Sequence, residues 1–596
     1  VHGTTGVVTD AITHAVSAAA PTVTVDIPRR QVDVRVPEAA WAPSGTVLLT
    51  AGVGVWDAST GNYAQPGPVA GPTQPGGCLL PCPALFNVAF RTAEPVPVIS
   101  AGIPTTSGTG FANTIVEGGV GVKLDGTWWR ERRQADVLKT GDVTPFTASV
   151  DFNRLASRAS DESMVPRTGH FDRIMASHFN LGQGVDYAVQ CFPNNPPECT
   201  GRYLGQLQPY AVYVPDKPIP TAGFGLVLSM HGLSANYNEF LGSHEAEQLG
   251  NRGTGSIIAS PEGRGPDGFY HNYAEADVFE MWADVARQYR LNPNLTDVSG
   301  YSMGGEGTYL LASRWPDLFG RAFPIVGPPT TAGSFRSLRN IPVMAWYGQT
   351  DELVGPEMSE QAFLNARAAG LRYDHWIFTP AGHVTLGNND EFTPGAAFLG
   401  DQPVDRNPPH VTYYRDPGLD TRALSKPDHA YWVSGITLGP GGTGTVEAVS
   451  QGFGVGDAPV LPLRLGAGVL MGGSHPGGLP YQERILDWGP TPSKPVADRL
   501  DVTVSNVSAL TVDVARARVD CKVDLHVLTD VTTTVRFTSC ARTVTVTANY
   551  GPNAPGLGLP RTSVATPVAP ATVLIVILLG VLGLAGRRGR RLSRSG

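Results

Sequence analysis

Short, continuously apolar runs alternate with longer runs of helical period between residues 209 and 400. The apolar runs predict six buried strands, at 225–230, 256–260, 295–299, 321–326, 342–347 and 372–378. The run 274–290 predicts an amphipathic helix, because apolar residues recur in it at three- and four-residue intervals: Val278, Met281, Trp282, Val285 and Tyr289. Strands that alternate with helices form a doubly wound, mostly parallel sheet with ligands at the carboxyl ends of its strands. We therefore predict an α/β domain over 206–400.

On both sides of this domain the apolar positions change to a period of two, which is typical of half-buried strands. Examples are the runs 22–27, 31–36, 500–504 and 542–547. We expect a β-rich, sandwich-like domain over 1–205 and another over 401–552. Such accessory domains either bind substrate or serve for packing and spacing, and the sequence leaves both roles open.

The pattern changes again near the C-terminus, where residues 571–586 are apolar and uncharged and are followed by five arginines: Arg587, Arg588, Arg590, Arg591 and Arg594. This order predicts a transmembrane anchor over 568–596 with the arginines on the cytoplasmic side, which would place the rest of the chain outside the cell. In the linker 553–567, the letters L-P-R-T-S at 559–563 resemble the L-P-x-T-G signal for attachment to Gram-positive cell walls by sortases. Ser563 replaces the usual glycine, so a simple membrane anchor remains the alternative.

At the other end of the chain, residues 18–20 are three alanines and resemble the small residues before a signal-peptidase site. Asp10 and His14 interrupt the apolar stretch before them, and no Lys or Arg precedes it. Either a signal peptide has been removed or the start is truncated.

The composition indicates the compartment in which the protein folds. The chain of 596 residues is long enough for three or four domains, and its 71 Gly and 51 Pro indicate many turns. Its six cysteines form three close pairs, which predict the disulfides Cys78–Cys82, Cys191–Cys199 and Cys521–Cys540. Complete pairing fits an oxidising compartment, and no pair has a second pair or histidines at the spacing of a metal site, so we expect no metal. The net charge of −8 without a basic stripe argues against nucleic-acid binding, and we expect a monomer.

The most specific motif is G-Y-S-M-G at 300–304, directly after a predicted strand and before a helix-like run. A serine on a sharp strand-to-helix turn exposes its hydroxyl, and glycines two residues away on each side relieve the crowding. An ordinary strand–loop–helix junction can give the same five letters. Ser302 is therefore a candidate nucleophile that needs support from elsewhere in the chain.

A nucleophilic serine needs a base, and the base needs a carboxylate that orients it. Asp351 follows the predicted strand 342–347, and His383 follows the predicted strand 372–378. Each residue alone could be an ordinary loop residue, but the order Ser, Asp, His at three strand ends predicts a catalytic triad.

Such a site also needs two backbone N–H groups aimed at the developing oxyanion. The residue after the nucleophile, Met303, should supply one of them. The loop H-G-L-S at 231–234, directly after the first predicted strand, should supply the other, and we assign it to Leu233 with Ser234 as the neighbouring option. His231 is expected to hold this loop by hydrogen bonds. We also expect Phe269, Tyr270 and Tyr301 to form part of the substrate wall.

The motifs at 229–232 and 300–305, together with Asp351 and the residues 380–383, resemble the α/β-hydrolases, in particular their secreted esterase and prolyl-oligopeptidase-like branch. This branch includes polyhydroxybutyrate depolymerases and feruloyl esterases, and the resemblance covers about 190 of the 596 residues. It implies Ser302 as nucleophile, His383 as base and Asp351 as its orienter, with no cofactor. The expected activity is extracellular hydrolysis of a small or polymeric ester, such as a polyester or an acylated polysaccharide. A peptidase with the same triad and a surface-binding protein with a degenerate hydrolase scaffold are the alternatives.

Overall fold

The computed structural model describes residues 1–26, 31–65, 67, 87–88, 143–161, 167–186, 191, 201–233, 235–240, 243–420, 424 and 426–549. The predicted linker 553–567, with its sortase-like motif, and the predicted anchor 568–596 lie outside these residues. Within the described ranges, no helix is both long and apolar enough to cross a bilayer.

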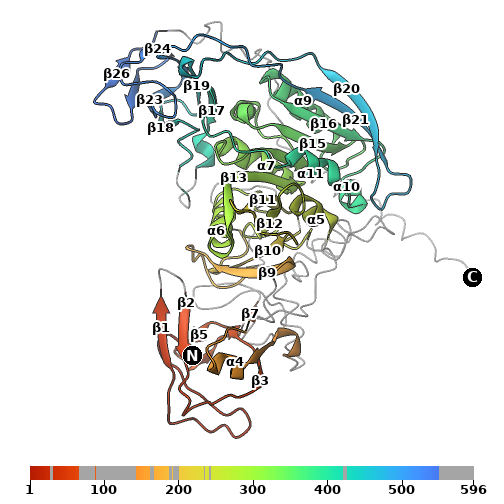
Figure 1. The fold of residues 1–596 in the computed structure, drawn as a ribbon, viewed down its shortest axis with the longest axis vertical. Helices are drawn as coiled ribbons and strands as arrows, with labels where there is room; N and C mark the ends of the chain where they lie inside the picture. Colours follow the sequence, from red (N-terminus) through yellow and green to blue (C-terminus); the bar gives the residue numbers. More distant parts are fainter. Residues whose placement is uncertain are drawn as a thin grey trace, which may run out of the picture.

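A ten-stranded mixed sheet forms the centre of the molecule (Figure 1), in the order β20-β21-β16-β15-β14-β13-β11-β12-β10-β9. In chain order its strands are β9 (Gly169–Ala176), β10 (Leu207–Val214), β11 (Phe224–Met230), β12 (Ser256–Pro261), β13 (Leu291–Tyr301), β14 (Ala322–Ile325), β15 (Val343–Gly348), β16 (Tyr373–Phe378), β20 (Arg464–Leu470) and β21 (Leu479–Leu486). The strands from β11 to β16 pair in parallel, and they are the six strands that the apolar runs predict. The prediction of a mostly parallel α/β sheet is therefore confirmed.

Helices cover both faces of this sheet. They are α5 (His244–Gly250), α6 (Tyr273–Gln288), α7 (Met303–Arg314), α8 (Ala332–Phe335), α9 (Pro356–Ala368), α10 (Thr385–Asn389), α11 (Thr393–Leu399) and the 3₁₀ helix η2 (Arg336–Asn340). Side chains of β11 alternate between two apolar clusters: Leu226 and Leu228 pack in the cluster that contains α6, α7 and α9, whereas Val227 packs with α5 and α11. The helix predicted at 274–290 is α6.

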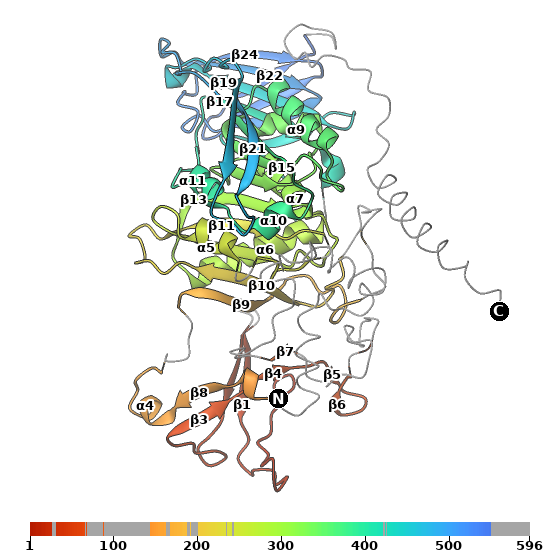
Figure 2. The ribbon, with the colours of Figure 1, turned by 90° about the vertical axis from the view of Figure 1, so that its right-hand side faces the viewer.

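The predicted domain boundaries at 205/206 and 400/401 are wrong in one respect, because strands from both flanking regions join the central sheet. Strand β9 pairs with β10 (Figure 2), and the hairpin β20–β21 pairs through β21 with β16 (Figure 1), all antiparallel. The ring of Tyr481 on β21 stacks on Trp376 of β16 at a centroid distance of 3.8 Å. A period of two identifies a strand but does not specify which sheet it joins.

The rest of the C-terminal region forms two four-stranded sheets. One contains β17 (His410–Arg415), β19 (Gly444–Ser450), β22 (Arg499–Ser505) and β24 (Asp524–Thr529), and the other β18 (Val433–Leu438), β23 (Val507–Val512), β25 (Thr533–Phe537) and β26 (Thr543–Val546), with the 3₁₀ helices η3 (Pro417–Leu419) and η4 (Gln451–Phe453) in the connections. Both sheets contribute to one apolar cluster, which includes Val446, Val502, Leu510 and Val535. We call these two sheets the C-terminal sandwich.

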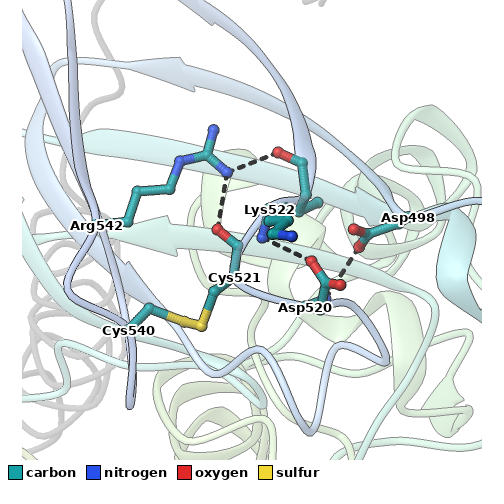
Figure 3. The surroundings of a disulfide bond; sticks show 7 residues. Asp498, Asp520, Cys521, Lys522, Cys540 and Arg542 are labelled. Atoms are coloured by element: carbon teal, nitrogen blue, oxygen red, sulfur yellow. Dashed lines mark hydrogen bonds between the residues drawn. A yellow bond between two sulfur atoms is a disulfide. The ribbon is translucent and has the colours of Figure 1, made fainter.

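The disulfide Cys521–Cys540, predicted from spacing, is present in the C-terminal sandwich (Figure 3). Arg542 donates to the carbonyl oxygens of Cys521 and Val523, at 3.2 and 2.8 Å. Cys191 is also disulfide-bonded. Its predicted partner Cys199 and the predicted pair Cys78–Cys82 lie outside the described residues.

The N-terminal region differs from the predicted sandwich-like domain. Its described strands occur only in pairs: β1 (Thr22–Asp26) with β2 (Gln31–Arg35), β3 (Thr46–Leu49) with β8 (Ala148–Asp151), β4 (Gly52–Val53) with β7 (Asn87–Val88), and β5 (Trp56–Asp57) with β6 (Asn62–Tyr63). The short helices η1 (Thr144–Phe146) and α4 (Phe152–Ala156) accompany them. Val25, Val32 and Val34 are exposed, so the alternating pattern of β1 and β2 does not bury a common face among the described residues.

Candidate active site

Ser302 lies on the sharp turn between β13 and α7 that the sequence motif predicts. Its φ of 55° is in the left-handed region, which costs energy for a residue with a side chain. A Cβ on Gly300 would lie 2.3 Å from the carbonyl oxygen of Gly304, and a Cβ on Gly304 would lie 2.0 Å from that of Met230. Both positions therefore require glycine, and the turn holds the serine at the carboxyl end of the sheet.

The structure brings the three predicted catalytic side chains together, although they lie far apart in the sequence. The Oγ of Ser302 is 2.7 Å from Nε2 of His383, and Nδ1 of His383 is 2.8 and 2.9 Å from the two carboxyl oxygens of Asp351. All three residues are buried. The Asp351 carboxylate also accepts the backbone N–H groups of Leu353 and Val354, at 2.8 and 2.7 Å. These bonds fix the carboxylate that faces the imidazole.

Two further residues hold the histidine loop, and sequence reasoning missed both roles. The Tyr301 hydroxyl donates to the carbonyl oxygen of His383 at 2.5 Å and accepts the Gly387 N–H at 3.1 Å. The Glu352 carboxylate accepts the His383 N–H at 3.1 Å. Neither contact leaves a signal in the sequence except adjacency to Ser302 and Asp351.

The predicted oxyanion loop after β11 lies directly against the nucleophile. A Cβ on Gly232 would lie 3.5 Å from Cβ of Ser302. Within the described part of the chain, the N–H groups of Leu233 and Met303 have no hydrogen-bond partner. His231 is buried with its ring nitrogens 2.9 Å from the carbonyl oxygens of Gly232 and Glu262, so it supports the loop as expected. Burial lowers the pKa of His231, against the contacts with the two carbonyl oxygens, which raise it.

Of the predicted substrate wall, the side chains of Tyr270 and Tyr301 are buried and hydrogen-bond to loops beside Ser302. The Tyr270 hydroxyl donates to the carbonyl oxygen of His231 at 3.0 Å, so this residue also supports the oxyanion loop. Phe269 is partly buried and packs against the cluster that contains α6. Aromatic residues in a loop at the carboxyl edge of a sheet fit a substrate wall and a loop support equally well.

Two buried carboxyl groups lie beneath the oxyanion loop. Glu239 accepts the Gly232 N–H at 2.6 Å, and Glu245 accepts the Ser229 hydroxyl at 3.2 Å. Burial raises the pKa of Glu239 to about 8, against the opposing effect of the Gly232 N–H. Burial and the nearby Glu239 raise the pKa of Glu245 to about 8. Both groups therefore favour the protonated, neutral form at pH 7.

A cavity of about 130 Å³ lies along one face of α7 and begins at Glu306, one helical turn after Ser302. Loops that follow β12 and β14 line it, together with residues of the C-terminal sandwich, and examples are His271, Thr330 and Tyr414. Burial raises the pKa of Glu306 to about 7. The described residues contain no group of three His, Cys, Asp or Glu that could hold a metal ion.

A parallel sheet with a strained serine turn, followed along the chain by Asp351 and His383 at later strand ends, defines the α/β-hydrolase fold. No protein-family model matches the sequence, and neither does any curated protein.

Similar solved structures are esterases and other serine hydrolases. A thermostable esterase is 20% identical over 34% of this chain and 60% of its own, with a TM-score of 0.30. A ferulic acid esterase is 12% identical over 39% of this chain and 98% of its own, with a TM-score of 0.30. The S-formylglutathione hydrolase of Staphylococcus aureus is 13% identical over 39% of this chain and 99% of its own, with a TM-score of 0.28.

Proposed function

We propose that the chain is a serine hydrolase that cleaves carboxylic esters through an acyl-enzyme. The observation that carries this proposal is the unbroken series of hydrogen bonds from Ser302 through His383 to Asp351. The Ser302 oxygen attacks the ester carbonyl while Nε2 of His383 takes the hydroxyl proton. His383 then gives this proton to the leaving alcohol, and a water molecule activated in the same way releases the acid.

Backbone groups complete the proposed mechanism. The N–H groups of Met303 and Leu233 would stabilise the oxyanion of each tetrahedral intermediate, since both lack a partner among the described residues. Asp351 keeps Nδ1 of His383 protonated and stabilises the imidazolium that forms.

The proposal extends to where the enzyme acts. The Cys521–Cys540 disulfide and the disulfide-bonded Cys191 support an oxidising compartment outside the cytoplasm. We therefore propose an enzyme of the cell surface, held by the membrane or the wall through the C-terminal segment. A polyester or an acylated polysaccharide would be its polymeric substrate.

The test is turnover of p-nitrophenyl acetate by the full chain and labelling by a fluorophosphonate probe. Ser302→Ala and His383→Ala should each lower kcat by on the order of a millionfold, and Ser302→Ala should also abolish labelling. Ser508→Ala, in the C-terminal sandwich, is the matched control and should change neither readout. Normal turnover by Ser302→Ala would overturn the assignment. Faster cleavage of peptide amides than of esters would favour a peptidase, and failure of the native chain to label would favour a binding protein.

A further inference from the structure

The carboxyl group of Glu239 is separated from the nucleophile by a single glycine. One of its oxygens accepts the Gly232 N–H at 2.6 Å. The Cβ position of Gly232 lies 3.3 Å from the other oxygen of Glu239 and 3.5 Å from Cβ of Ser302. The carboxyl group therefore touches the loop segment that carries the proposed oxyanion donor of Leu233.

The surroundings of Glu239 disfavour a negative charge. The side chain is almost completely buried, at 5% exposure, and the described residues form no salt bridge with it. Among the described residues, the pKa values of Glu245 on α5, Tyr270 and Tyr301 are raised by the charge of Glu239. None of these groups is a cation that could compensate a carboxylate.

We propose that Glu239 is a positioning residue that holds the oxyanion loop against Ser302 as a neutral carboxylic acid. An acceptor oxygen on Glu239 fixes Gly232 and hence the direction of the next N–H, that of Leu233. Neutrality matters because an ionised Glu239 would place a negative charge beside the site where the oxyanion develops, and like charges repel strongly where water is excluded. This inference rests on the proposed function.

The raised pKa of Glu239, about 8, gives the proposal a measurable consequence. Below this pH the carboxyl group is neutral and the transition state is stabilised. As the pH rises through it, Glu239 loses its proton and kcat should fall. Neither Ser302 nor the backbone donors would cause a fall in this range.

The experiment measures the pH dependence of kcat and KM for p-nitrophenyl acetate, from pH 6 to 9.5, after subtraction of the rate seen with Ser302→Ala. Glu239→Ala should lower kcat about 100-fold with a much smaller change in KM, because a displaced oxyanion donor is lost only in the transition state. Glu239→Gln keeps an acceptor oxygen and cannot ionise, so it should restore kcat to within about tenfold of the native chain and abolish the alkaline fall. Glu245→Gln is the matched control and should retain the fall.

An alkaline fall that persists in Glu239→Gln, or one that disappears only in Glu245→Gln, would overturn the inference. If Glu239→Ala does not fold, the pH profile of Glu239→Gln decides alone. Failure of the proposed function is distinguishable, because the native chain would then show no turnover that depends on Ser302.

Discussion

The central α/β region and the C-terminal sandwich bury their polar groups in different ways. The α/β region buries many ionisable side chains: Glu239, Glu245, Arg252, Glu262, Arg264, Asp267, Glu275, Asp277, Asp284, Asp297, Arg314, Asp351, His375 and His383 are examples. Among the described residues 405–549, Arg415 is the only buried charged side chain. Hydroxyl groups take this place in the sandwich, where Thr533 bonds to the hydroxyl of Thr529 at 2.6 Å and donates to the carbonyl oxygen of Val507 at 2.7 Å.

The two regions thus differ in the number of ionisable side chains that they bury. Burying a charge costs several kcal/mol unless partners compensate it, whereas a hydroxyl bonded to a nearby acceptor costs little. In the α/β region, ion pairs such as Arg252 with Asp297 and Arg314 with Glu275 offset part of that cost. The sandwich contains no comparable cluster among its described residues.

After the substitutions of Ser302 and His383, the largest expected effect comes from Asp351→Asn. The amide cannot hold the required imidazole tautomer, so kcat should fall about ten-thousandfold, or about 5.5 kcal/mol of barrier, while the sandwich remains folded. Steady-state kinetics with p-nitrophenyl acetate measure the first quantity and hydrogen exchange of the full chain measures the second. Asp498→Asn, on an exposed carboxylate of the sandwich, should leave kcat unchanged. Equal effects of the two changes would contradict the separation of roles.

The next prediction concerns the loss of unfolding free energy when a buried ion pair of the α/β region is broken. Arg314 pairs with Glu275 through two hydrogen bonds, at 2.8 and 3.0 Å, with side-chain exposures of 7% and 1%. Arg314→Met leaves a buried carboxylate without its cation and should lower the free energy of unfolding by about 3–5 kcal/mol in denaturant titrations.

The sandwich provides a matched comparison for Arg314. Arg415 pairs with Asp420, whose side chain is more exposed, at 15%. Arg415→Met should therefore cost less, about 1 kcal/mol. An equal or larger loss for Arg415→Met would show that the sandwich depends on buried charge as much as the α/β region.

The double change Cys521→Ser and Cys540→Ser should act on the sandwich alone. The two cysteines are 19 residues apart, and opening a loop of this size costs about 3 kcal/mol of unfolding free energy. Thermal unfolding followed by hydrogen exchange should show the loss in β22–β26, with unchanged kcat. A parallel loss of kcat would mean that the sandwich supports the active site directly.

The last comparison concerns pH. Burial raises the pKa values of Glu239 and Glu245 to about 8, of Asp277 to about 7 and of Asp297 to about 6. Each folded-state pKa exceeds its unfolded value, so the stability from these protonated groups is complete below about pH 4 and is lost as pH rises to 8.

The melting temperature of the α/β region should therefore decrease from pH 5 to 8 relative to that of the sandwich, and Glu245→Gln should reduce the difference. Hydrogen exchange at several temperatures and pH values separates the two regions. A parallel pH dependence of both regions would contradict the comparison.

The sequence predicts the parts of this molecule whose signals are local. Continuous apolar runs identify the six parallel strands because each strand is buried on both faces. The glycines at 300 and 304 identify the serine turn, and strand ends identify Asp351 and His383. By contrast, Glu239 and Glu352 act on backbone groups that only the folded chain brings near them. For the same reason, the sequence gives no sign that the Tyr301 hydroxyl bonds to the histidine loop.

Because of the hairpin β20–β21, no single position in the chain separates the α/β region from the C-terminal sandwich. The chain leaves the α/β region, builds β17–β19, returns to extend the central sheet, and leaves again to complete β22–β26. Truncation after residue 400 would uncover the backbone hydrogen-bonding groups of β16, and an unpaired edge strand invites aggregation. A fusion protein that contains the α/β region would thus have to include the hairpin β20–β21 as part of the central sheet.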